Sequence, residues 1–227
     1  MIRALAPYAA RVIQVVLMSW GLAGAANGQS LRHHYLIVYG YQDRSNSVHN
    51  SHTFASFIES TGSRDADDLQ GFESHSISWL PVSRDVRLLR LSPQSARNFS
   101  LSETLQIASD ARLSVMRWGP IEVSEGFYQA GLRRIAFLES GSVSYIVDDK
   151  PYRSGVYQFR SGGAINCIHA VSDVGGLLRT EFRHGFGASV AVFDSLRRWG
   201  MATQSTNEWV AVELGVDSIP RHDIRLP

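Results

Sequence analysis

The chain has 227 residues and nearly balanced charge, with 22 lysines and arginines against 21 aspartates and glutamates. This balance gives no electrostatic reason to expect nucleic acid or an anionic membrane surface as a partner. Residues 26–227 are enough for one domain with a core of its own, and we expect a single domain there.

The amino end, residues 1–25, has the layout of a secretory signal peptide. Arg3 and Arg11 give it a positive start, the apolar run 12–23 follows, and Ala23-Gly24-Ala25 suits a signal peptidase. The run is shorter than the roughly 20 apolar residues that span a bilayer, so we expect no integral membrane span in the mature chain. The sequence therefore predicts a secreted or periplasmic protein, with an uncleaved amino-terminal membrane anchor as the alternative.

Cys167 is the only cysteine of the chain. An exported protein of this size could use disulfides, yet a single cysteine cannot form one within the chain, so the fold must rest on its core. An unpaired thiol in an oxidising compartment is either buried as a small apolar side chain or reactive. Composition leaves both interpretations open.

Strands are expected in the first part of the chain, where β-branched and aromatic runs and strict alternation occur. The expected strands cover residues 35–41, 52–58, 74–80 and 86–91, with polar loops at 42–50 and 60–71. The clearest is 74–80, where His75, Ile77 and Trp79 point one way and three serines the other. His52 and His75 would each stand at the beginning of a strand.

Helices are expected in the second part of the chain, at residues 103–112, 122–140, 164–174 and 189–199. Ser100 lies three positions before Glu103, which predicts a capping box for the first helix. Trp118-Gly119-Pro120 is expected to break the helical segment, and a strand at 143–147 and a turn at 148–151 are expected further on. The tail from Asn207 is short and has only a loose pattern. Early strands and later helices predict an α+β domain with an antiparallel sheet packed against helices.

Cys167 falls near the start of the expected helix 164–174, after Gly162-Gly163. Free N–H groups and the dipole at a helix start stabilise a thiolate, which is the nucleophilic form of cysteine. A cysteine nucleophile also needs a base, normally histidine, held by a third polar group. His52 and His75 are the candidates for these two roles.

The motif Asn166-Cys167-Ile168-His169 resembles the Asn-Cys-x-His of the lecithin:retinol acyltransferase-like branch of circularly permuted, papain-like (NlpC-type) proteins. In that group a histidine on a strand comes first, a second polar residue lies on a following strand, and the cysteine starts a helix far downstream. The order His52, His75, Cys167 agrees with this pattern. Ile168 and Ala170 depart from it, because the branch typically has Glu and Phe at these positions.

The resemblance implies a papain-like arrangement in permuted order and a thiol hydrolase or acyltransferase that acts on an amide or ester bond through a thioester. It implies Cys167 as nucleophile, His52 as base and His75 as the residue that orients the base. Asn166 and His169, beside the nucleophile, are candidates for contacts with the substrate or the oxyanion. A cell-wall peptide or a lipid acyl chain would suit the compartment as a substrate.

Other site types find less support in the sequence. His49 and His52 are three apart and His33 and His34 are adjacent, but neither pair has a matching second pair of zinc ligands. There is no Gly-x-Ser-x-Gly elbow and no phosphate-binding glycine fingerprint, and we expect neither metal nor cofactor. The rival interpretation is a non-catalytic, envelope-associated binding or structural protein in which Cys167 is a buried structural side chain.

Overall fold

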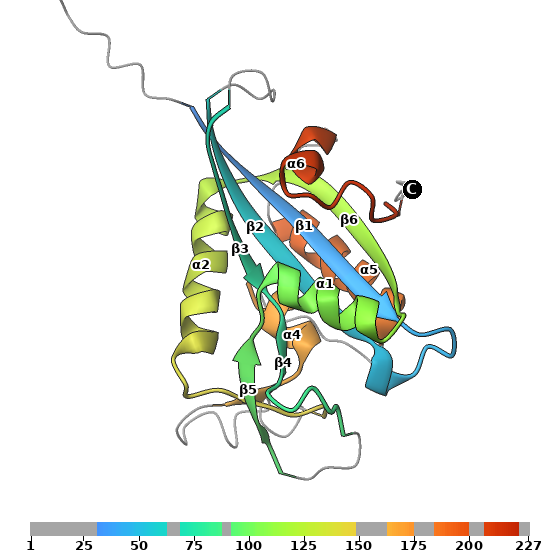
Figure 1. Cartoon of the computed structure of the whole chain (residues 1–227). Helices are drawn as coiled ribbons and strands as arrows, with labels where there is room; N and C mark the ends of the chain where they lie inside the picture. Colours follow the sequence, from blue (N-terminus) through green and yellow to red (C-terminus); the bar gives the residue numbers. More distant parts are fainter. Residues whose placement is uncertain are drawn as a thin grey trace, which may run out of the picture.

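The computed structural model describes residues 31–62, 69–87, 92–148, 163–174, 184–199 and 207–222 (Figure 1). The expected leader 1–25 lies outside the described residues. Among the described residues, no helix is long and apolar enough to span a membrane.

The main sheet has four antiparallel strands in the order β3-β2-β1-β6. These strands are β1 (Arg32–Gln42), β2 (His52–Gly62), β3 (Leu69–Ile77) and β6 (Ser114–Val123). The side chains of β1 alternate between two hydrophobic clusters, because both faces of this sheet are covered. β2 and β3 both extend into the segment 60–71, which the sequence had predicted to be a loop.

Helices cover the two faces of the main sheet (Figure 1). One face, with Leu36 and Phe57, packs against α2 (Glu125–Glu139), α4 (Cys167–Ser172) and α5 (Gly185–Trp199). The other face, with Tyr35 and Phe54, packs against α1 (Leu101–Asp110) and α6 (Glu208–Glu213). The α+β class with antiparallel strands and packed helices is therefore confirmed.

A second, smaller sheet lies below the first in Figure 1 and has the strand order β4-β5-β7-β8. Its members are β4 (Trp79–Pro81), β5 (Gln94–Asn98), β7 (Ser144–Tyr145) and β8 (Ala164–Ile165). β7 and β8 pair in parallel, and β8 leads directly into α4. This sheet therefore helps to fix where α4 begins. A short 3-10 helix, η1 (Val48–Asn50), interrupts the loop between β1 and β2.

Two helix starts follow the expected chemistry. Ser100 caps α1 with both hydrogen bonds of a capping box to Glu103, and the Ser124 hydroxyl accepts the Phe127 N–H at the start of α2. Gly141, with a φ of 77°, follows the end of α2.

Several sequence predictions need correction. Trp118-Gly119-Pro120 does not separate two elements but lies inside β6. Gly119 adopts a φ of 96° there, at a shift in the β1/β6 register. β5 and α6 were not expected at all. Val86 and Arg87 lie outside any strand, and the rest of the predicted strand 86–91 lies outside the described residues. Residues 149–151 of the predicted turn 148–151 also lie outside the described residues.

Candidate functional site

Cys167 is the first residue of α4, which agrees with its predicted place near a helix start. The helix is shorter than the predicted 164–174, because Ala164 and Ile165 form β8 instead. The helix starts there because Asn166 acts as its N-cap, with Oδ1 accepting the His169 N–H at 2.9 Å. The Asn166 amide also donates to the Val147 carbonyl at 3.2 Å, which ties the cap to the end of β7.

Arg134 of α2 fixes the opposite end of this short helix. Its guanidinium donates to the carbonyl oxygens of Ala170 at 3.1 Å and His169 at 3.0 Å, and to the Asp173 carboxylate at 3.2 Å. The last carbonyl groups of a helix have no partner within the helix, and an arginine can satisfy several of them at once. A helix of six residues is thus held at both ends by side chains.

The Cys167 sulfur lies where several hydrogen-bond donors converge. The backbone N–H groups of Thr53, Cys167 and Ile168 and the hydroxyl of Tyr145 donate to it, and each lowers the pKa of the thiol. Burial has the larger, opposite effect and raises the pKa to about 11, because the residue is only 7% exposed. At neutral pH the group is therefore a thiol.

His52 begins β2 and is 1% exposed. Its Nε2 lies 2.9 Å from the Ser78 hydroxyl, which in turn accepts a hydrogen bond from Thr104 of α1 at 2.7 Å. Its ring stacks on Phe54 at 5.5 Å, and burial lowers the pKa of the imidazole to about 3. Nδ1 is buried and has no hydrogen-bond partner among the described residues.

The structure brings Cys167 and the start of β2 together. Thr53, which donates its N–H to the sulfur, directly follows His52. Tyr41 lies opposite His52 with ring centroids 5.2 Å apart, and its pKa is raised by burial and, secondarily, by the charge of Cys167. The His52 ring nevertheless faces α1, whereas α4 covers the other face, and no hydrogen bond joins the two side chains in the described structure.

His75 does not orient His52. It lies near the end of β3, not at its beginning, and pairs with Phe57, five residues from His52 along β2. That separation is roughly 16 Å along a strand, and the odd spacing places the two histidines on opposite faces. The Nε2 atom of His75 lies 2.9 Å from a Glu73 carboxylate oxygen instead. The group that holds His52 is the Ser78 hydroxyl.

Asn166 and His169 have structural positions that the sequence-based roles did not anticipate. Both polar atoms of the Asn166 side chain bond to backbone groups of the protein, so this amide fixes α4. His169 is 5% exposed and lies within the packing of α4. Neither side chain is presented to a substrate in this structure.

Ser78 and Tyr145 were missed as members of the site. Ser78 sits between β3 and β4, and Tyr145 reaches the sulfur only because β7 pairs with β8 beside α4. Strands of two or three residues carry no periodic signal. In the sequence Ser78 is one of three alternating serines in 74–80, and only the structure shows that it is the buried one.

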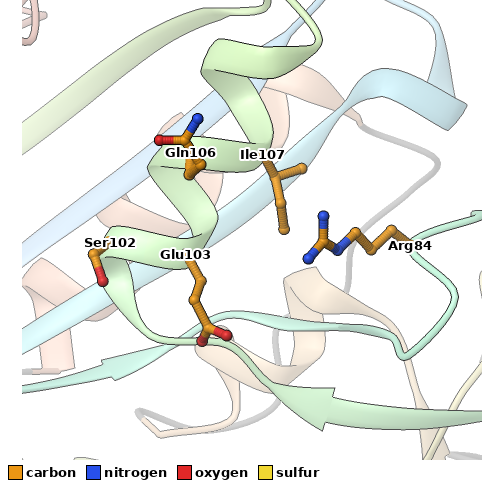
Figure 2. Close-up of a pocket in the computed structure, with 5 residues that line it drawn as sticks. All are labelled: Arg84, Ser102, Glu103, Gln106 and Ile107. Carbon is orange, nitrogen blue, oxygen red and sulfur yellow. The ribbon is translucent and has the colours of Figure 1, made fainter.

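A surface pocket of about 280 Å³ lies away from these residues, on the outer side of α1. Arg84, Ser102, Glu103, Gln106 and Ile107 line it (Figure 2). Thr104, by contrast, is fully buried and bonds to Ser78, so the helix separates the pocket from His52.

Within the described residues, no group of three or more potential ligands is placed to hold a metal ion. His33 pairs with Glu122 at 3.1 Å and His34 with Glu59 at 2.9 Å, on opposite faces of the main sheet.

Comparisons with models of known protein families, with curated proteins and with solved structures gave no match. The geometry around Cys167 is therefore the main support for a function.

Proposed function

We propose that the chain is a cysteine-dependent hydrolase or acyltransferase that acts on an amide or ester bond through a thioester on Cys167. One observation carries this proposal. The sulfur receives three backbone N–H groups and the Tyr145 hydroxyl at the start of β2, beside His52, whose buried Nδ1 has no hydrogen-bond partner among the described residues. Nδ1 is one of several buried side-chain atoms with no partner among the described residues, and in the proposed reaction it is the atom that accepts the proton of the thiol.

The reaction assigns one role to each group. The Cys167 sulfur forms a bond to the substrate carbonyl carbon while its proton passes to Nδ1 of His52. The carbonyl bond to oxygen or nitrogen then breaks, and His52 returns the proton to the leaving alcohol or amine. Water, or an acceptor alcohol or amine, attacks the thioester through the same base and releases the sulfur, which takes its proton back.

Donors beside the nucleophile support this sequence of steps. Backbone N–H groups can stabilise the negative charge that develops on a carbonyl oxygen under attack, and those of Cys167 and Ile168 at the start of α4 are the candidates for this role. The steps also require Nδ1 to come within hydrogen-bond distance of the sulfur, and because the His52 ring faces α1 while α4 covers the other face, the His52 side chain must reorient at the start of β2 when substrate binds.

A papain-like arrangement in permuted order is part of the proposal. A cysteine that starts a helix, packed on an antiparallel sheet whose strand begins with a histidine, agrees with the resemblance of Asn166-Cys167-Ile168-His169. We further propose that residues 1–25 direct export and that the substrate is a cell-wall peptide or a lipid acyl ester, which are the acyl compounds of that compartment.

A non-catalytic, envelope-associated protein is the second candidate, and one specific observation favours it. Burial keeps the Cys167 thiol protonated, with a pKa raised to about 11, and no imidazole is hydrogen-bonded to it in the described structure. In that case Cys167 contributes packing alone, and its replacement by serine changes stability without changing any activity.

The test is to detect an acyl group on Cys167. The purified chain is mixed with p-nitrophenyl acetate, quenched in acid and digested. The mass of the peptide that contains Cys167 is then measured by mass spectrometry. We expect one acetyl group on this peptide and release of p-nitrophenol, and we expect Cys167→Ser to keep its melting temperature within a few degrees and lose both signals. An unmodified Cys167 in the folded wild type, or equal turnover in Cys167→Ser, would favour the second candidate.

A further inference from the structure

Arg84 has a backbone conformation that arginine rarely adopts. Its φ is 60°, and its N–H closes a turn by donating to the Pro81 carbonyl at 2.8 Å. Glycine and asparagine are the residues that commonly occupy this left-handed region. A residue in this region costs free energy, and such residues cluster at functional sites, which makes the surroundings of Arg84 a place to look for a ligand site.

No carboxylate of the described residues neutralises the charge of Arg84. Among the described residues, no carboxylate forms an ion pair with it, and its guanidinium lies 5.8 Å above the ring of Phe99. Glu103 lines the same pocket, but its carboxylate already accepts hydrogen bonds from the Arg97 guanidinium at 2.7 Å and from the Ser100 N–H at 2.9 Å. These bonds, that of the Ser100 N–H first, lower the pKa of Glu103 to about 2.

The pocket beside Arg84 suits a small ligand. Its volume of about 280 Å³ corresponds to roughly nine water molecules, which leaves room for a small amino acid or the end of a short peptide. Figure 2 shows the Arg84 side chain reaching from its turn toward α1, into the space between Glu103 and Ile107. Ser102 adds a hydroxyl group and Ile107 an apolar wall.

We propose that this pocket binds a monoanionic carboxylate, such as the free carboxyl end of a short peptide, with Arg84 as its cation and Ser102 as a further donor. An arginine fork matches the two oxygens of a carboxylate. A dianion such as phosphate fits less well, because the Glu103 carboxylate lines the same space. This site is separate from Cys167, so the proposal of a carboxylate site does not depend on the proposed reaction.

Three probes test the ligand class on the full chain by NMR of the backbone amides of residues 101–107. N-acetyl-alanine should shift these signals in a saturable way, with a Kd on the order of 1 mM. N-acetyl-alaninamide, which differs only in lacking the carboxylate, should bind at least about tenfold more weakly, as should inorganic phosphate. Equal binding of the amide, tighter binding of phosphate, or no saturable shift with the acid would overturn the proposal.

Arg84→Gly tests the residue itself. Glycine adopts the positive φ without strain, so we expect the melting temperature to rise while the affinity for N-acetyl-alanine falls at least about tenfold. Arg112 provides a matched control, because it is an arginine with a φ of 52° outside the pocket. Arg112→Gly should raise the melting temperature and leave binding unchanged. Binding that survives in Arg84→Gly, or a melting temperature that falls in that variant alone, would show that Arg84 does not serve a ligand.

Discussion

Burial affects the ionisation of Cys167 and His52 in the same sense, because an apolar surrounding favours the neutral form of each group. It raises the pKa of the Cys167 thiol to about 11 and lowers that of the His52 imidazole to about 3. The resting site at neutral pH therefore holds a thiol and a neutral imidazole. A thiolate is expected only as the proton leaves for a base during the reaction.

The lowered pKa of His52 predicts an acid-dependent loss of stability. Between pH 6.5 and about 3 the unfolded chain binds the proton and the folded chain does not, so stability is fully present above pH 6.5 and falls as the pH drops. Urea unfolding across this range should show a difference between wild type and His52→Gln that changes by at most about 1.4 kcal/mol per pH unit. A difference that stays constant with pH would mean that His52 titrates normally in the folded protein.

Local chemistry decides which site residues can be found from sequence. Cys167 was placed at a helix start because its cap, Asn166, is adjacent in the chain. Ser78 and Tyr145 could not be placed, since they reach His52 and Cys167 through contacts distant in sequence. His75 was expected at the beginning of a strand, but β3 begins at Leu69, which puts this histidine near the strand's far end and five residues from His52 along β2.

At the scale of single elements, long and well-capped segments were predictable. α1 and α2 were found from a capping serine and from apolar residues at helical spacing. β6 was missed because glycine followed by proline usually ends a helix or strand. In the structure Gly119-Pro120 lies at a register shift inside a strand. α6 has only six residues, too few for a periodic pattern.

α2 lies so close to the main sheet that a methyl group has no room at one position. A Cβ atom at Gly131 would overlap the ring of Phe57, which is fully buried, so the helix or the ring would have to shift. We expect Gly131→Ala to destabilise the protein by about 1–3 kcal/mol in urea unfolding.

Gly126 is the matched control on the same helix, because a Cβ atom there would meet nothing within 4 Å. Gly126→Ala should be neutral or stabilising by up to about 1 kcal/mol, as alanine favours the helix. If both variants behave alike, the close approach of α2 to Phe57 is not as described.

Over the whole molecule, the site depends on the meeting of two sheets. The main sheet supplies His52 and Thr53, and the small sheet supplies Tyr145 and the strand that leads into α4. The sequence predicted the α+β class and the antiparallel pairing of its early strands. It could not predict the second sheet, whose strands of two to five residues come from segments far apart in the chain.

The rate of the first acylation step tests the central claim most directly. Stopped-flow release of p-nitrophenol from p-nitrophenyl acetate would be compared in wild type, His52→Gln and His75→Gln, each at equal folded concentration. General-base catalysis contributes about 10²–10⁴-fold, so we expect His52→Gln to acylate Cys167 at least about 100-fold more slowly. His75→Gln should match the wild type, because His75 pairs with Phe57, five residues along β2 from His52, and its ring is held by Glu73. Equal rates in all three proteins, or no acylation of Cys167 in any of them, would contradict the account.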